Sequence, residues 1–237
     1  MKIRRRKYCS LSYEPMLLEA IKQNNAMAYI KRGTFSTEVV WGGKAFLFPS
    51  KNKKDYSTFK SGLFMFNKVR SDAMAFLNAN PKFKLPKRER SIVYSNDIPK
   101  NILRKVCATD LNHAYWRLAL NLGVITNATY RKGLPTKLKS IRLAALSTLG
   151  AGRTYLLIND GVQTKESVTF GVDEGLKDVY KLIRYTCYKH MTKLAKMLGG
   201  DFLAYKTDCI YYYDTPTNRA IVNKYFQAND LLFKQLS

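Results

Sequence analysis

The chain lacks several features that would assign it to a familiar class of protein. No apolar run in its 237 residues reaches the roughly 18 residues that span a bilayer, and no lipidation motif is visible. The basic start is not followed by an uninterrupted apolar signal core, so neither secretion nor a membrane partner is expected. There is no internal repeat and no low-complexity segment. These absences favour a cytoplasmic protein.

Cysteine and histidine are also scarce. The four cysteines form no Cys-x-x-Cys pair, and two histidines are too few to complete a structural zinc site with them. Free thiols, buried in a protein of the reducing cytoplasm, are the expected state. The residues concerned are Cys9, Cys107, Cys187, Cys209, His113 and His190.

Acidic residues are few compared with basic ones. The chain has 17 Asp and Glu against 41 Lys and Arg, which gives a formal net charge of +24 and a pI near 9.9. Such a charge suits a polyanionic partner, because neutralising phosphates releases counterions and gives affinity without reading sequence. Hydrophobic residues make up 46% of the chain, enough for a folded core. The composition therefore favours a folded protein that binds nucleic acid.

Two of the few carboxylates stand in similar surroundings about a hundred residues apart. Asp110 lies in the segment 106–116 and Asp208 in the segment 202–212, each at the end of an apolar, strand-like run. Carboxylates on adjacent strand ends can hold a pair of Mg²⁺ ions, which clamp the attacking and leaving oxygens of a phosphoryl transfer. The alternative is that each Asp merely ends a strand and starts a turn.

Both segments resemble metal-binding motifs of family B DNA polymerases. Asp110-Leu-Asn-His-Ala-Tyr-Trp116 is similar to the first motif, Asp-x-x-Ser-Leu-Tyr-Pro, and keeps the Asp and the Tyr. Lys206-Thr-Asp-Cys209 is similar to the third motif, Asp-Thr-Asp-Ser, with Lys206 in place of the first Asp. Between them, Arg142-Leu-Ala-Ala-Leu-Ser-Thr-Leu-Gly150 resembles Lys-x-x-x-Asn-Ser-x-Tyr-Gly. The resemblance covers about residues 105–213 and does not extend to the first hundred.

The resemblance implies a catalytic centre and its ligands. Asp110 and Asp208 would be the catalytic residues and, with the carbonyl of Leu111, would bind two Mg²⁺ or Mn²⁺ ions. Tyr115 matches the position that packs under the incoming sugar, with an ordinary core aromatic as the alternative. Arg142 would meet the triphosphate, with a solvated helix face as the alternative. Ser147 and Lys139 complete the expected nucleotide-binding set.

Basic residues outside that set are candidates for contact with nucleic acid. They occur at the start of the chain, around 131–132 and beside the second Asp; the set is Arg4, Arg5, Arg6, Lys7, Arg131, Lys132 and Lys206. The expected partners are a DNA template and primer, or RNA, together with nucleoside triphosphates and other replication proteins.

The order of elements predicts an α+β fold. We expect a polymerase-palm-like antiparallel sheet with helices on one face, in a core of residues 91–237, with a short helical fingers hairpin at about 117–150. Residues 1–90 would form a separate basic α/β region. Expected helices cover about 67–78, 111–121, 136–149, 175–198 and 217–236; expected strands cover 91–95, 155–159, 167–172, 202–206 and 209–213, with two more around Gly42-Gly43.

The function that this pattern predicts is a minimal polymerase or primase-type nucleotidyltransferase that extends a 3′-hydroxyl. No Asp-x-Glu proofreading motif occurs in the first hundred residues, and the short stretch after Asp208 leaves no room for a thumb. A virus or mobile element would be a natural source, and the host cytoplasm the location. The alternative is a degenerate palm without catalysis, which serves as a non-specific nucleic-acid-binding replication or virion protein. Retention of both Asp110 and Asp208 favours the enzyme.

Affinity for nucleic acid should fall steeply with salt and depend little on base sequence, because it rests on counterion release. Fluorescence anisotropy with labelled oligonucleotides over about 50–200 mM salt measures both properties. Asp110→Asn should bind as well as the wild type or better, since the change removes a negative charge beside bound phosphates. A large loss of affinity in this variant would contradict the assignment.

Overall fold

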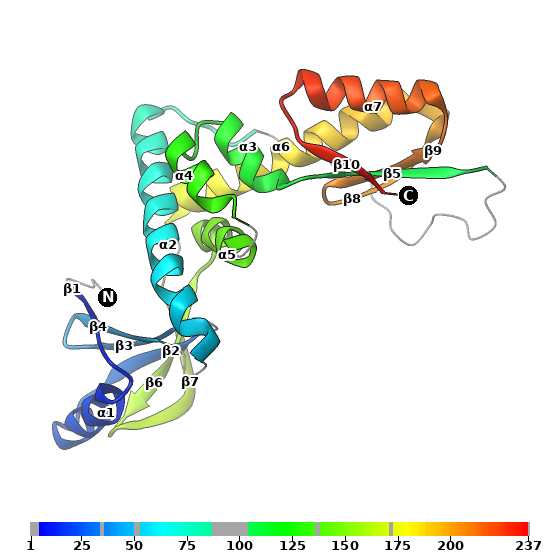
Figure 1. Cartoon of the computed structure of the whole chain (residues 1–237). Helices are drawn as coiled ribbons and strands as arrows, with labels where there is room; N and C mark the ends of the chain where they lie inside the picture. Colours follow the sequence, from blue (N-terminus) through cyan, green and yellow to red (C-terminus); the bar gives the residue numbers. More distant parts are fainter. Residues whose placement is uncertain are drawn as a thin grey trace.

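The computed structural model describes residues 5–33, 36–49, 53–86, 104–135, 138–170 and 173–236. Within these ranges the strands form two sheets, one of six strands and one of four. Figure 1 shows the sheets at opposite ends of the molecule, with a group of helices between them. None of the helices in the described ranges is long and apolar enough to cross a membrane.

The six-stranded sheet has the order β1-β4-β3-β2-β6-β7. Its strands are β1 (Arg5–Tyr8), β2 (Ala28–Arg32), β3 (Ser36–Trp41), β4 (Lys44–Pro49), β6 (Arg153–Asn159) and β7 (Val162–Phe170). The predicted hairpin around Gly42 and Gly43 is confirmed: both glycines have positive φ, 56° and 74°, in the turn between β3 and β4. Helix α1 (Tyr13–Gln23) packs Leu17 and Ile21 against one face of this sheet.

The four-stranded sheet has the order β10-β5-β9-β8, and all neighbours are antiparallel. Its strands are β5 (Val106–Leu111), β8 (Phe202–Lys206), β9 (Cys209–Tyr213) and β10 (Phe233–Leu236). Helix α6 (Glu174–Leu198) precedes β8, a short 3₁₀ turn (Gly199–Asp201) joins them, and α7 (Pro216–Ala228) lies between β9 and β10. The order of these elements is that of a split β-α-β unit.

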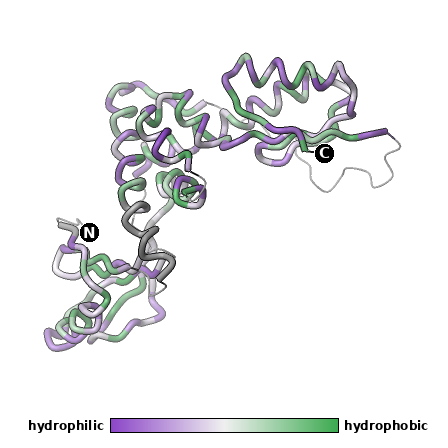
Figure 2. Tube along the Cα trace, in the orientation of Figure 1, coloured by the Kyte–Doolittle hydropathy of each residue, from purple (hydrophilic) through white to green (hydrophobic). Residues whose placement is uncertain are grey.

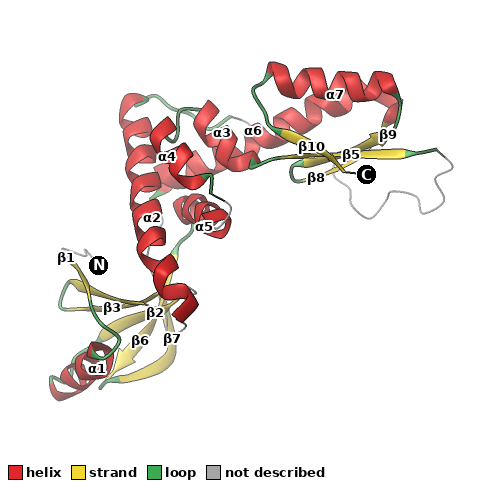
Figure 3. Ribbon diagram, in the orientation of Figure 1, coloured by secondary structure: helices red, strands yellow, loops and turns green. Residues whose placement is uncertain are grey.

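One face of the four-stranded sheet is covered by helices, as Figure 3 shows for α6 and α7. Along β5 the residues Cys107, Thr109 and Leu111 are buried, whereas Asp110 between the last two is partly exposed. Because strand side chains alternate between faces, Asp110 lies on the face away from the helices. The expected α+β class with a mixed helical and antiparallel composition is confirmed.

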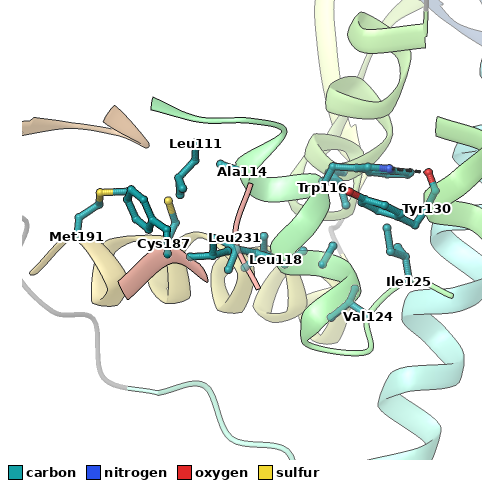
Figure 4. Packing of buried hydrophobic residues seen from close by; sticks show 14 of the residues in the cluster. Leu111, Ala114, Trp116, Leu118, Val124, Ile125, Tyr130, Cys187, Met191 and Leu231 are labelled. Atoms are coloured by element: carbon teal, nitrogen blue, oxygen red, sulfur yellow. Dashed lines mark hydrogen bonds between the residues drawn. The ribbon is translucent and has the colours of Figure 1, made fainter. Parts of the chain in front are cut away.

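The helices between the sheets share one hydrophobic core with the four-stranded sheet. They are α2 (Lys53–Ala79), α3 (Ala114–Asn121), α4 (Asn127–Gly133) and α5 (Lys139–Gly150). Trp116 of α3 stacks on Tyr130 of α4 at 6.4 Å between ring centroids, and its Nε1 donates to the Tyr130 carbonyl at 3.0 Å (Figure 4). A Cβ at Gly133 would lie 2.5 Å from the Trp116 ring. This close packing joins α3 to α4.

Amphipathic patterns explain most of the helices, as the alternating colours along α7 in Figure 2 illustrate. Two predicted elements differ from the structure. The helix predicted at 67–78 extends over 53–79. The last helix ends at Ala228 rather than at 236, because Asp230 turns the chain with a φ of 55° and residues 233–236 pair with β5. The strand predicted at 91–95 lies outside the described residues.

The division of the chain at residue 90 does not follow the sheets. Strands β6 and β7, from the second half of the chain, extend the six-stranded sheet through β2, with Tyr29 opposite Leu157. Ile158 of β6 packs into the same core as Leu17 of α1. Burial of apolar β6 residues against the first region therefore overrides their position in the sequence, so 91–237 is not one continuous core.

Candidate active site

Asp110 and Asp208 lie at adjacent strand ends. Strand β5 pairs with β9 in a register that puts Asp110 opposite Cys209, the residue after Asp208. The N–H of Leu111 donates to the carbonyl of Asp208 at 3.0 Å, which closes the ladder at this end. The two segments singled out from the sequence therefore meet, although about a hundred residues separate them.

The carboxylates influence each other. Burial is the first cause that raises the pKa of the Asp208 carboxyl, and the negative charge of Asp110 is the second; the charge of Lys139 acts in the opposite direction. Two carboxylates that repel each other gain from a cation placed between them. Carboxylate oxygens are also the ligands that Mg²⁺ prefers, and two can suffice when phosphates supply the rest. The pair therefore fits a divalent ion, although the described residues contain no group of three or more such side chains.

The turn that carries Asp208 is held in an unusual conformation. Lys206 pairs with Cys209, so Thr207 and Asp208 form a two-residue turn between β8 and β9. Thr207 has a φ of 57°, which is costly for a β-branched residue. The buried thiol of Cys187 in α6 donates to the Thr207 carbonyl at 3.5 Å. Helix α6 thus helps to hold this turn in place.

Arg142, predicted to meet the triphosphate or else to lie on a solvated helix face, is buried rather than solvated. Its side chain is 1% exposed, and Nη1 donates to the carbonyls of Gly133 at 2.8 Å and Leu134 at 3.4 Å. Nη2 donates to Nδ1 of His113 at 2.6 Å. All these partners belong to the protein, so a phosphate could reach this guanidinium only by breaking buried hydrogen bonds.

Lys139 is the cation of α5 that affects the acidic pair. It is the first residue of the helix and is exposed, and its charge acts to lower the pKa of Asp208. It also contributes, after burial and Arg142, to the lowered pKa of His113. Lys139 belongs to the predicted nucleotide-binding set, but Arg142 is the cation that stands in the register of the polymerase motif.

His113 links the turn after Asp110 to the helices. It has a left-handed φ of 57° just before α3 begins. Burial first, and then the charges of Arg142 and Lys139, lower the pKa of its imidazole. The ring is therefore neutral near pH 7, and Nδ1 can accept from Arg142. This bond ties the loop that follows Asp110 to α5 and to the end of α4.

Tyr115 lies beside the second carboxylate. Its pKa is raised strongly, mainly by burial and then by Cys187, Tyr188 and, to a smaller extent, Asp208. The ring also packs against the main hydrophobic core, which agrees with the core-aromatic alternative.

Arg184 of α6 adds a cation to this neighbourhood that lies outside the predicted set of site residues. Its Nη2 donates to the Tyr188 hydroxyl at 3.0 Å, and its guanidinium lies 5.9 Å from the centres of the Tyr180 and Tyr188 rings. The spacing of Tyr180, Arg184 and Tyr188 by four residues each on a helix was a usable signal, since it places all three on one face.

The remaining predicted site residues lie on different elements of the structure. Ser147 is exposed about two turns beyond Lys139 on α5, and its hydroxyl donates to the Ala144 carbonyl at 2.9 Å. Lys206 is exposed and adjoins the turn that carries Asp208. Arg131 and Lys132 are exposed in the last turn of α4, where Lys132 lies 4.6 Å from the centre of the Phe64 ring.

The basic start of the chain does not adjoin the acidic pair. Lys7 belongs to β1 of the six-stranded sheet, at the other end of the molecule in Figure 1, and its Nζ lies 5.6 Å from the centre of the Tyr13 ring. Only the backbone of Arg5 and Arg6 is described, and Arg4 lies outside the described residues. Any contact of this region with nucleic acid is thus separate from the acidic pair.

Lys234 was not predicted. It stands opposite Asp110 in the pairing of β10 with β5, and its Nζ lies 3.6 Å from Oδ2 of Asp110. The contact was not expected, because residues 217–236 were predicted as one helix.

No family model, curated protein or solved structure matches the chain. The functional argument therefore rests on the geometry of the residues described above.

Replacing the buried guanidinium should destabilise the fold. Arg142→Met leaves the carbonyls of Gly133 and Leu134 without their donor, and we expect a loss of about 3 kcal/mol in the free energy of unfolding. Urea denaturation measures this loss. Arg131→Met, at an exposed position of α4, is the matched control and should change stability by less than about 0.5 kcal/mol. Equal stability of both variants would refute the structural role of Arg142.

The stability should also depend on pH through His113. Its pKa is lowered in the folded state, whereas an unfolded histidine titrates near 6.5, so the unfolded chain binds more protons as pH falls. Stability is therefore complete above about pH 7 and decreases as pH falls through 6.5. His113→Asn, which cannot titrate, should weaken this dependence in urea denaturation between about pH 7.5 and 5.5. An unchanged slope would contradict a neutral, partly buried His113.

Proposed function

We propose that the protein is a nucleotidyltransferase related to family B DNA polymerases, which adds nucleotides to a 3′-hydroxyl. In this proposal the four-stranded sheet with α6 and α7 is the palm, and α3, α4 and α5 are reduced fingers. The observation that carries it is the meeting of Asp110 and Asp208 on adjacent strand ends, joined by the hydrogen bond from Leu111 to Asp208. The split β-α-β order of the sheet supports it.

Asp110, Asp208 and the carbonyl of Leu111 would hold Mg²⁺ or Mn²⁺. When bound, the metal would supply positive charge to the phosphates and lower the pKa of the attacking hydroxyl. The carboxylates themselves need support to act as ligands, because they are close and repel each other. The hydrogen bonds around Thr207 and Leu111 provide it by holding both strand ends in place.

Other residues would bind and orient the nucleotide. Lys139, exposed at the start of α5 and close enough to affect Asp208, would neutralise the triphosphate as pyrophosphate leaves. Tyr115 would pack against the sugar, and Arg184 is a second cation near it. Arg142 would act only by holding His113 and the turn after Asp110.

Nucleic acid would be held mainly by charge. The net charge of +24 gives non-specific attraction to phosphates. Lys206, beside the turn that carries Asp208, is an exposed cation that would contact a strand at the acidic pair. Arg131 and Lys132 of α4 are exposed cations on the fingers. The partners proposed are a DNA template and primer, or RNA, and nucleoside triphosphates.

A second candidate function is binding without catalysis. One observation favours it: both carboxylates already have a lysine nearby, Lys234 beside Asp110 and Lys139 near Asp208. Positive side chains can balance an acidic pair in a protein that has lost its need for metal. A non-specific nucleic-acid-binding protein of a replication complex or virion would keep the fold and the charge in this way.

Substitutions at the site distinguish the two functions. Asp208→Ala should abolish metal-dependent incorporation of labelled nucleotides, because the remaining carboxylate cannot hold the metal alone. Lys206→Ala should lower the rate only modestly. Lys139→Ala should raise KM for the nucleotide about tenfold, since it removes a charged contact to the triphosphate. Lys224→Ala, at an exposed position of α7, is the control and should behave as the wild type.

The wild type must first show incorporation. Primed and unprimed DNA and RNA, each with Mg²⁺ and with Mn²⁺, cover the substrates of the proposal. A well-folded preparation that is inactive with all of them, yet binds nucleic acid, would favour the binding protein over the enzyme.

A further inference from the structure

The strand that ends the described chain brings a lysine to the acidic pair. In the pairing of β10 with β5, Lys234 stands directly opposite Asp110, and residues opposite each other in an antiparallel pair point to the same face. Nζ of Lys234 lies 3.6 Å from Oδ2 of Asp110. The lysine therefore lies on the face of the sheet where the carboxylates would receive a metal ion.

The ion pair between Lys234 and Asp110 is partly exposed and can open. The Lys234 side chain is 55% exposed and that of Asp110 is 26% exposed, so the ammonium can leave the carboxylate for water at little cost. Among the described residues, two charges act on Asp208: the negative charge of Asp110 and the positive charge of Lys139. Lys234 is thus the cation paired with Asp110, while Lys139 serves Asp208.

We propose that Lys234 is a built-in counter-ion of Asp110 that a divalent metal ion must displace, so that this lysine sets how tightly the site takes metal. The inference rests on the proposed function, because it takes Asp110 and Asp208 as metal ligands. An ammonium ion and a metal ion compete for the same carboxylate, and their positive charges repel each other at such short range. Metal binding and the Lys234–Asp110 ion pair therefore exclude each other.

The ion pair would also affect the order in which metal and nucleotide bind. In the free protein the ion pair opposes the metal, so a divalent ion alone binds weakly. A nucleotide brings phosphates that can accept the displaced ammonium, and its arrival with the metal removes the competition. The arrangement favours binding of metal and nucleotide together over binding of metal by itself.

The test measures Mn²⁺ binding to the free, full-length protein by titration calorimetry, without nucleotide. Lys234→Met should bind Mn²⁺ about three- to tenfold more tightly than the wild type, because the competing cation is gone. Lys234→Gln, a second neutral variant, should do the same, whereas Lys234→Arg should keep the affinity of the wild type. Lys224→Met removes an equal charge from α7, on the helical side of the sheet, and should change the affinity by less than about twofold.

A purely structural role for the ion pair would not tighten metal binding, so the direction of the change is decisive. One outcome would overturn this inference and leave the proposed function standing. In it, the wild type binds Mn²⁺, Asp110→Asn and Asp208→Asn do not, and both neutral Lys234 variants bind it no more tightly than the wild type. Lack of Mn²⁺ binding in the wild type and in both neutral variants would overturn the metal site and with it the proposed function. Binding by the neutral variants alone would support the inference.

Mn²⁺ should also raise the melting temperature of Lys234→Met more than that of the wild type, since a ligand that binds the folded state more tightly stabilises it more. Thermal unfolding with and without Mn²⁺ checks this independently of activity. An equal shift in the two proteins would count against the competition.

Discussion

The antiparallel pairing of β5 with β9 is the interaction on which the rest of the site depends. It joins two segments about a hundred residues apart, and the hydrogen bond from Leu111 to the Asp208 carbonyl ends it at the acidic pair. Burial of Cys107 and Leu111 in the hydrophobic core fixes which face of β5 turns inward. Since strand faces alternate, the same burial sends Asp110 to the opposite face. A slip of one residue would bury the carboxylate, so the core and the site stabilise one register.

The helices between the sheets hold this strand end from the other side. Arg142 is buried, and its guanidinium donates to the carbonyl of Gly133 and to the imidazole of His113. The stacking of Trp116 on Tyr130 joins the same helices through apolar contact. The buried charge of Arg142 thus serves to fix the loop after Asp110, whereas Lys139, one turn earlier, remains exposed and acts on Asp208.

The balance of charge at the site follows from this arrangement. Two carboxylates in a chain with few acidic residues repel each other, and each has a lysine in its neighbourhood. The lysines balance part of this negative charge, and both are exposed. The pairing of lysines with the carboxylates fits a binding protein, and in an enzyme it would regulate metal binding. The two proposed functions therefore differ in metal affinity rather than in fold.

Local pattern was enough to identify Asp110 and Asp208 at strand ends, the hairpin at Gly42-Gly43, and the strands 202–206 and 209–213, because alternation, turn residues and charge act over a few neighbours. Other features depended on contacts between distant segments. Arg142 reads as a surface cation until α4 supplies buried carbonyls for it, and β6 joins the first sheet only because β2 offers an edge and α1 an apolar face. Lys234 meets Asp110 because residues 233–236 find a free edge of β5, which outweighs their helical pattern. The sequence by itself thus determined the chemistry available at the site, and the tertiary structure decided which charges meet there, because such contacts form between segments that only folding brings together.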